Sequence, residues 1–138
     1  MSLLGITKGT DLENEVERYL KAESQGVVMY YGLARLAAEK GLDDVADLLI
    51  KLAGDEARHA GLYAVLNGHI NQDIIAVLTH AAKAETAGRE QINALANKAR
   101  SLGFDEAACE IEVAAEDEGR HGIVLEALLK KHLLVSDK

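Results

Sequence analysis

The two halves of this 138-residue sequence repeat each other, and the repeat limits the possible folds more than any other feature. Residues 55–59 read DEARH and residues 117–121 read DEGRH, and the halves align without a gap at an offset of 62 positions. An amphipathic pattern common to two helical hairpins would not explain polar identities at fixed positions. We therefore infer an internal duplication and a pseudo-twofold structure. The identical pairs include Lys21/Lys83, Ala22/Ala84, Glu23/Glu85, Gly26/Gly88, Leu33/Leu95, Gly41/Gly103, Asp43/Asp105, Asp55/Asp117, Glu56/Glu118, Arg58/Arg120 and His59/His121.

The chain is expected to be entirely helical. It contains no proline, and its alanine-, leucine-, glutamate- and lysine-rich composition favours long, uninterrupted helices. Residues 10–13 (TDLE) have the form of a capping box. Gly41 and Gly103 suit left-handed helix ends, and Asp43 and Asn71 suit helix starts. The pattern predicts four helices, at about 10–40, 44–66, 71–102 and 105–131.

These four helices would form two hairpins, one in each copy of the repeat. We expect a single all-α domain over residues 1–138, a four-helix bundle whose repeat halves span about 11–67 and 71–131. The first nine residues and the tail over 132–138 are expected to be frayed ends.

Charge and composition narrow the classes of partner. The formal net charge is −8, which argues against nucleic acid or an anionic membrane, because both attract a basic surface. Apolar runs are shorter than the roughly 18–20 residues that a membrane span requires, and no signal-peptide pattern is present. Cys109 is the one cysteine, so it has no partner for an internal disulfide. We expect a cytoplasmic protein without a nucleic-acid or membrane partner.

Charged residues interrupt the apolar stripe of every predicted helix. Counting by three and four from each repeated glutamate leads mainly to alanine, leucine, isoleucine, valine, tyrosine and glycine, so each glutamate lies on a core-facing stripe. A histidine follows two of them by three residues and lies on the same face. The residues concerned are Glu23, Glu56, Glu85 and Glu118, with His59 and His121.

Four ionised carboxylates cannot share a bundle interior unless they are protonated or surround cations, because desolvation and repulsion are both costly. Two divalent ions would balance the four charges, with the histidines as neutral ligands. One Glu from each of two helices, with Glu-x-x-His from each of the other two, is the ligand set of di-iron and di-manganese bundles. The sequence therefore predicts a two-metal site. Iron or manganese suits these ligands, and zinc can also bind.

Asp55 and Arg58, and their counterparts Asp117 and Arg120, complete the repeated motif. A metal-bound imidazole needs an acceptor at its second nitrogen. Each aspartate could hold a histidine, that of the opposite repeat included, while the arginine pairs with the aspartate. The alternative is a surface ion pair between residues three apart on one helix.

These motifs together resemble the rubrerythrin branch of the ferritin-like superfamily, over about residues 11–131. The resemblance is carried by AESQ at 22–25, Tyr30, EKG at 39–41, and the DEARH and DEGRH motifs. It implies a ferritin-like four-helix bundle that binds two iron ions and reacts with hydrogen peroxide or dioxygen, in protection against oxidative stress.

The sequence departs from the rubrerythrin pattern at two points. Rubrerythrins usually carry a rubredoxin-like domain with two Cys-x-x-Cys pairs, whereas this sequence has only Cys109. Electrons would then come from a separate donor, such as a rubredoxin-like protein. Rubrerythrins also have a further glutamate where this chain has Gly88. The remaining four-Glu, two-His set is closer to that of bacterioferritin and argues against the usual peroxidase redox switch.

The resemblance assigns a role to each predicted ligand. Tyr30 would hydrogen-bond a ligand or intercept stray oxidation, unless it is a packed core tyrosine. Gly26 and Gly88 would leave room for a small oxidant. Glu56 and Glu118 would bridge the metals, Glu23 and Glu85 would be terminal ligands, and His59 and His121 would bind one metal each.

The connection between the two halves is short. Residues 67–71 would reach at most about 17 Å, whereas a ferritin-like bundle with parallel second and third helices needs a crossover of about 30 Å or more. The start of the third helix could unwind, or those helices could be antiparallel. We favour a domain-swapped homodimer, in which each metal site combines the first-half ligands of one chain with the second-half ligands of the other.

Three functions are compatible with these observations. The first is a di-iron oxidoreductase that reduces hydrogen peroxide or dioxygen. The second is ferroxidase activity or iron handling in the manner of ferritins, and the third is a metal-stabilised bundle without catalytic activity.

Overall fold

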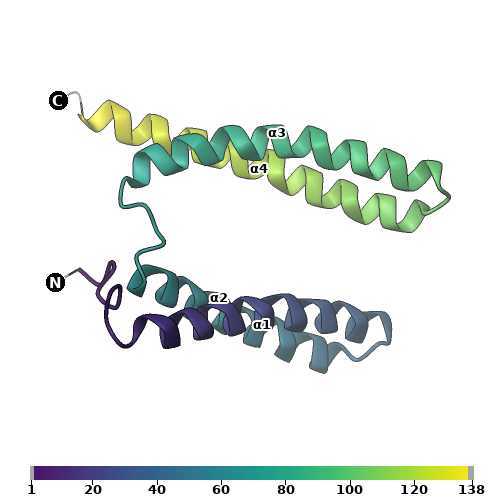
Figure 1. The fold of residues 1–138 in the computed structure, drawn as a ribbon. Coiled ribbons are helices and arrows are strands. Elements are labelled where there is room, and N and C mark those ends of the chain that lie inside the picture. Colours follow the sequence, from purple (N-terminus) through teal and green to yellow (C-terminus); the bar gives the residue numbers. More distant parts are fainter. Residues whose placement is uncertain (1, 137–138) are drawn as a thin grey trace. The chain divides into compact units, whose positions relative to one another are not determined.

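The computed structural model describes residues 2–136, with side chains through His132. Four helices account for most of these residues, and the described part of the chain contains no strand (Figure 1). They are α1 (Glu13–Glu39), α2 (Asp43–Leu66), α3 (Ile74–Ser101) and α4 (Asp105–Ser136). The all-α prediction is confirmed. The fourth helix runs five residues beyond its predicted end, so the expected frayed tail is wrong through Ser136; residues 137–138 lie outside the described part.

The chain divides into two compact units, the first ending at Asn71 and the second beginning at Gln72. In the first unit α1 packs along α2, and in the second α3 packs along α4, so each unit is an antiparallel helical hairpin (Figure 1). Gly41 and Gly103 close the first helix of each hairpin with positive φ angles of 71° and 82°. The prediction of left-handed ends at these two glycines is confirmed.

Alanine forms most of the interface between the helices of each hairpin. Three repeat-related pairs are buried, and four of the six residues are completely inaccessible to solvent. A small side chain at these positions lets two helix backbones approach closely, so the helices pack with little volume between them. The pairs are Ala34 and Ala96, Ala46 and Ala108, and Ala53 and Ala115.

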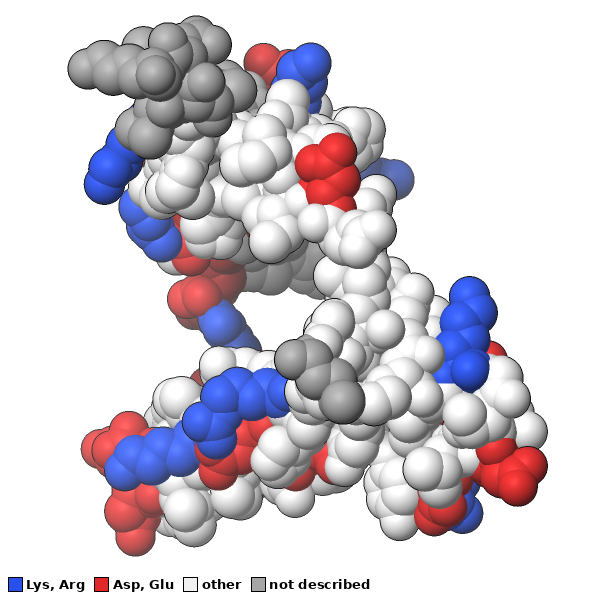
Figure 2. Space-filling model, turned by 90° about the vertical axis from the view of Figure 1, so that its left-hand side faces the viewer, with Lys and Arg blue, Asp and Glu red and all other residues white. Residues whose placement is uncertain are grey.

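Large apolar side chains remain exposed on both hairpins. Val28 is 75% exposed in the first unit and Ile123 is 68% exposed in the second, and Leu33 and its repeat partner Leu95 are also exposed. Much of the face drawn in Figure 2 carries no charged residue. Because a two-helix hairpin buries only one stripe of each helix, the remaining apolar stripes are available for further packing.

The predicted helix starts are wrong in detail. Thr10 does not cap α1, because its hydroxyl accepts from Leu12 N at 3.2 Å while its backbone carbonyl accepts from Glu13 N. Asp43 is already the first residue of α2, and Leu42 precedes it without a side-chain cap. The cap of α3 is Asp73 instead of Asn71, and its Oδ1 accepts from Ala76 N at 3.0 Å.

The N-terminal segment is folded against the end of α2, contrary to the expected frayed start. Gly5 N donates to Val65 O at 2.9 Å, and Thr7 N donates to Leu66 O at 3.0 Å. The Thr7 hydroxyl also contacts Asn67 Oδ1 at 2.6 Å, and both residues are buried. We call this set of contacts the clasp. It fixes the C-terminal end of α2 where the connection to the second unit begins.

Candidate metal centre

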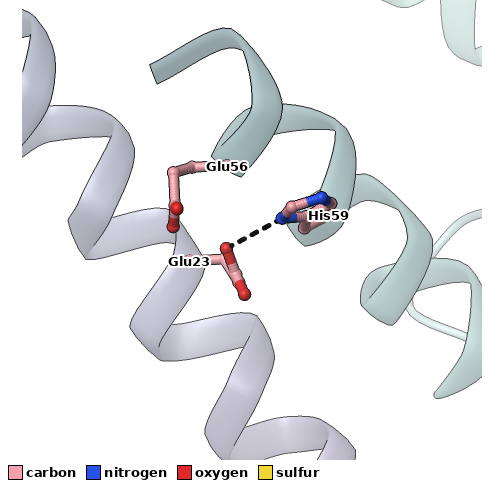
Figure 3. A group of neighbouring side chains, drawn as sticks. All are labelled: Glu23, Glu56 and His59. Carbon is pink, nitrogen blue, oxygen red and sulfur yellow. Dashed lines mark hydrogen bonds and ion pairs between the residues drawn. The ribbon is translucent and has the colours of Figure 1, made fainter. Parts of the chain in front are cut away.

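The first unit brings three of the predicted ligands together. Glu23 comes from α1, Glu56 and His59 come from α2, and one ligand atom of each lies within 4.8 Å of the other two. His59 Nδ1 lies 3.3 Å from Glu23 Oε2 (Figure 3). The Glu23 side chain is only 17% exposed, while that of His59 is 50% exposed. We call these three residues the first triad.

The second unit contains the same arrangement. Glu85 comes from α3, Glu118 and His121 come from α4, and their ligand atoms also lie within 4.8 Å of one another. His121 Nδ1 lies 3.3 Å from Glu85 Oε2, which is the corresponding distance in the first triad. These three residues form the second triad. The repeat in the sequence is therefore a repeat in side-chain geometry.

Local helix geometry explains why each triad forms. Ala53 lies three residues before Glu56, and His59 lies three residues after it, so all three share one face of α2. Ala53 is completely buried against α1, which directs Glu56 toward the facing Glu23. Ala115 and Glu118 have the same relation in α4. In each hairpin, the buried alanine sets the distance between the two helices, and the glutamate three residues later lies next to this contact.

Each triad holds two glutamates close enough to perturb each other. A hydrogen bond with Glu23 raises the pKa of Glu56 above the ordinary glutamate value of 4.5, and desolvation and the charge of Glu23 add to the rise. The hydrogen bond from Glu56 lowers the pKa of Glu23. Glu118 and Glu85 show the same opposite shifts. Two ionised carboxylates this close repel each other, so a proton or a cation between them is favoured.

Two glycines face these carboxylates, as the sequence predicted, but with different clearances. A Cβ atom placed on Gly26 would lie 2.6 Å from Glu56 Oε2, which is too close for any real contact. A Cβ atom on Gly88 would lie 3.5 Å from Glu118 Oε2, an ordinary van der Waals separation. Gly26 therefore provides the space that the Glu56 carboxylate occupies, whereas Gly88 leaves free space next to Glu118.

The aspartate and arginine residues of the motif pair with each other. Arg58 binds Asp55, and Arg120 binds Asp117 at 2.8 Å, in both cases across one helix turn. The two arginine side chains are 72% and 65% exposed. Within each hairpin the motif therefore forms the surface ion pair that was the alternative interpretation. A hydrogen bond in which an aspartate accepts from a histidine of the opposite repeat stays a prediction.

Tyrosines surround the first triad only. Tyr19 and Tyr63 stack with their ring centroids 5.8 Å apart, four residues before Glu23 and four residues after His59. Their contact was not predicted, although counting from the glutamates placed both on the core-facing stripe. Tyr30 is half-buried on α1, two helix turns beyond Glu23, and its role at the metal site stays a prediction.

The sequence pattern did not predict a second polar cluster, which lies at the end of α2. Asn67 Nδ2 donates to Glu13 O and to Glu17 Oε2, and His69 Nε2 lies 2.6 Å from the same Glu17 oxygen. The bonds to His69 and Asn67 lower the pKa of Glu17. Asparagine and histidine after a helix were visible in the sequence, but no local pattern linked them to α1, about 50 positions earlier.

Among the described residues, no helix combines the length and the apolar character that crossing a membrane would need.

Comparisons with known proteins agree with the geometry. The sequence model of the Rubrerythrin family matches residues 16–129. An uncharacterized protein of Methanocaldococcus jannaschii is 36% identical over 129 residues, covering 94% of this chain and 92% of that protein. Reverse rubrerythrin-1 of Clostridium acetobutylicum is 32% identical over 134 residues, covering 94% of this chain and 73% of that protein. The chain therefore belongs to the rubrerythrin family, and its four helices are those of the ferritin-like four-helix fold.

Proposed function

We propose that the protein is a cytoplasmic di-iron oxidoreductase that reduces hydrogen peroxide or dioxygen with electrons from a separate donor. The observation that carries this proposal is the pair of Glu-Glu-His triads, one in each hairpin, with matching side-chain geometry. Membership of the rubrerythrin family supports iron as the metal. Manganese or zinc would suit the same carboxylate and imidazole ligands.

The residues of the two triads have the chemistry that a pair of divalent ions requires. Four carboxylates carry four negative charges when ionised, and two divalent ions balance them while the imidazoles remain neutral. The raised pKa of Glu56 beside Glu23 reflects repulsion between the two carboxylates, which a cation between them would relieve. Cation binding would therefore favour the ionised form of the carboxylates in each triad.

Each ligand would have a distinct part in holding the ions. The family resemblance assigns Glu56 and Glu118 the bridging role, and each lies in a triad with a second carboxylate. Glu23 and Glu85 would be terminal ligands, and the exposed imidazoles of His59 and His121 would bind one ion each. A ferrous pair held in this way would supply the two electrons that convert hydrogen peroxide and two protons to two water molecules.

The surroundings of the triads favour a small oxidant. A Cβ atom would fit beside Glu118 at Gly88, and we propose that a small oxidant approaches there. Tyr30, on the helix that carries Glu23, would hydrogen-bond a ligand or intercept stray oxidising equivalents. The two electrons would be returned by a rubredoxin-like partner, since the one cysteine of this sequence, Cys109, cannot form a Cys-x-x-Cys redox centre.

Anaerobic titration with ferrous ion, followed by a pulse of hydrogen peroxide or dioxygen, tests this proposal. Two iron ions per chain and rapid oxidation of both are expected. The variant Glu56→Gln with Glu118→Gln should lose most of the iron while keeping its helices, as measured by circular dichroism. Slow accumulation of many ferric ions would instead indicate ferroxidase activity with storage. Absence of binding would leave a bundle without catalytic activity.

A further inference from the structure

We propose that Gly122 is a positioning residue for the second triad. Because it has no side chain, α4 can approach α3 closely at the level of the triad, and this close approach brings His121 and Glu118 within reach of Glu85. The role of Gly122 rests on the proposed function, since it concerns ligands that would hold iron, and it involves the second hairpin alone.

Gly122 lies on the stripe of α4 that packs against α3. It follows Ala115 by seven residues and precedes Leu129 by seven residues, and all three are buried. Seven residues make almost two helix turns, so the three residues share one face of α4. Gly122 is therefore part of the contact between the two helices, and its neighbour in the sequence is the candidate ligand His121.

A side chain at position 122 would find no space on α3. A Cβ atom on Gly122 would lie 2.6 Å from Thr86 Oγ1 and 3.3 Å from both Ala82 O and Thr86 N. Two of these three atoms belong to the backbone of α3, so the two helix backbones come close together here. The Thr86 hydroxyl donates to Ala82 O at 2.9 Å, and a β-branched side chain has little rotational freedom in a helix. An alanine at position 122 would therefore push α4 away from α3.

This contact lies at the level of the second triad. Thr86 follows Glu85 on α3, and Gly122 follows His121 on α4. The separation of 3.3 Å between His121 Nδ1 and Glu85 Oε2 spans the two helices at this level. A metal ion requires its ligand atoms to converge at fixed distances. Displacement of α4 from α3 at Gly122 would therefore separate the ligands on α4 from the ligand on α3.

The first hairpin has different residues at the corresponding positions. Ser24 and Ala60 occupy the places of Thr86 and Gly122, and Ala60 is only half-buried. The tight contact of the first hairpin is instead that of Gly26, on α1, with a glutamate of its own triad. Glycine destabilises a helix interior relative to alanine. Its presence at position 122 therefore indicates a requirement for close approach that position 60 does not have.

Gly119 provides a comparison within the same helix. A Cβ atom on Gly119 would lie 2.7 Å from Arg89 Cδ, which is also too close. The three nearest atoms, however, all belong to the side chain of Arg89, which is exposed. A long exposed side chain can change its rotamer without displacing its helix backbone. The same substitution at Gly119, next to the candidate ligand Glu118, should therefore leave the helix spacing unchanged.

The substitution Gly122→Ala tests this proposal, with Gly119→Ala as the matched control. Both variants gain the same helix propensity, and both changes adjoin a candidate ligand. In crystal structures of the metal-free variants, Gly122→Ala should widen the separation between His121 Nδ1 and Glu85 Oε2 beyond the 3.3 Å of the wild type. Gly119→Ala should leave that separation unchanged. Urea denaturation measures the stability of each variant separately.

Iron affinity provides the second measurement. Anaerobic ferrous titration should show a loss of about 10- to 100-fold in Gly122→Ala, the range found for residues that orient a metal ligand. Gly119→Ala should bind iron nearly as the wild type does. Adding Thr86→Ala to Gly122→Ala removes the contact at 2.6 Å and should recover much of the affinity, although the two contacts at 3.3 Å remain. A merely structural role for Gly122 would change the stability without this pattern of loss and recovery.

The outcomes separate this role of Gly122 from the proposed function. An unchanged Gly122→Ala, equal losses in Gly119→Ala, or a loss that Thr86→Ala does not recover would overturn the role. If Gly122→Ala alone does not fold, the double variant decides, since an intermediate ligand separation and affinity would support the role and wild-type values would overturn it. Wild type that binds no iron would overturn the proposed function, and the crystal structures would still test the helix spacing.

Discussion

The two hairpins hold the same triad in different surroundings. The ligands, the buried alanines and the distance of 3.3 Å between histidine and glutamate are the same in both. The first unit alone has the tyrosines, the clasp and the tight contact of Gly26 with Glu56. In the second unit, a Cβ atom on Gly88 would be at an ordinary van der Waals separation from Glu118. The repeat has retained the candidate metal ligands and the buried alanines, while the surroundings of the two triads have diverged.

The largest effect is expected from removing one carboxylate of either triad. Glu56→Gln and Glu118→Gln should each weaken ferrous binding by at least about 100-fold, since even the residues that support a ligand contribute 10- to 100-fold. Anaerobic titration measures both. Similar losses would show that both triads contribute to iron binding. If only one substitution mattered, only one of the triads would hold iron.

A second comparison concerns the position occupied by Asn67 in the first unit and Leu129 in the second. Both residues are buried, at 3% and 7% exposure. Leu129→Ala should lower the free energy of unfolding by about 2–5 kcal/mol through loss of packing. Asn67→Ala should lower it by about 1–3 kcal/mol, because Thr7 and Glu17 lose hydrogen-bond partners. Urea denaturation measures both values.

Hydrogen exchange distinguishes the two mechanisms. Asn67→Ala should release residues 2–10, whereas Leu129→Ala should leave their protection unchanged. Protection of residues 2–10 that persists without the Asn67 side chain would contradict the role given to the clasp.

Alanine substitution of Gly26 and of Gly88 should distinguish the two hairpins, with an effect of about tenfold on metal affinity at Gly26. Gly26→Ala should displace the Glu56 carboxylate and weaken iron binding by about 10-fold, which is about 1.4 kcal/mol. Gly88→Ala should leave iron binding nearly unchanged. Gly88→Ala should stabilise the metal-free protein by about 0.5–1 kcal/mol, because alanine is the better helix former, whereas the clash with Glu56 offsets this gain in Gly26→Ala. Equal losses of iron binding would show that the clearances do not differ as described.

Acid dependence provides a further prediction for the metal-free protein. Glu56 and Glu118 have raised pKa values, so the native state binds more protons than the unfolded state just above pH 4.5, and stability falls as pH rises through that window. Glu23 and Glu85 have lowered pKa values, so stability also falls as pH drops below 4.5. Thermal melts from pH 3 to 8 should therefore show a maximum near pH 4.5 from these groups.

Substitution of the paired glutamates provides the control for this pH dependence. Glu56→Gln with Glu118→Gln should flatten the decline above pH 4.5, because the groups that titrate there are gone. A decline that persists unchanged would assign the proton uptake to other residues.

The smallest effect is expected from Asp55→Asn and Asp117→Asn. Exposed ion pairs such as those with Arg58 and Arg120 contribute at most about 1 kcal/mol. Iron binding should therefore change little, as titration would show. A loss of 10-fold or more in either variant would mean that the aspartate holds a histidine of the opposite repeat.

The sequence predicted the helices and the helix faces that carry the candidate ligands, because both depend on local periodicity. Glu56 and His59 share a helix face because they are three residues apart. Gly41 and its counterpart Gly103 each end a helix with a left-handed turn. The helix caps were wrong because Thr10 and Asp43 have backbone alternatives to side-chain capping. The clasp was unpredictable, since it joins Thr7 to Asn67 across 60 positions, and periodicity contains no information about such contacts.

The central claim of the proposed function is that the residues of the two triads hold iron. Anomalous diffraction at the iron absorption edge, from crystals grown anaerobically with ferrous ion, tests it most directly. We expect iron peaks within reach of the Glu56 and Glu118 carboxylates. The absence of an iron peak within reach of either carboxylate would contradict it.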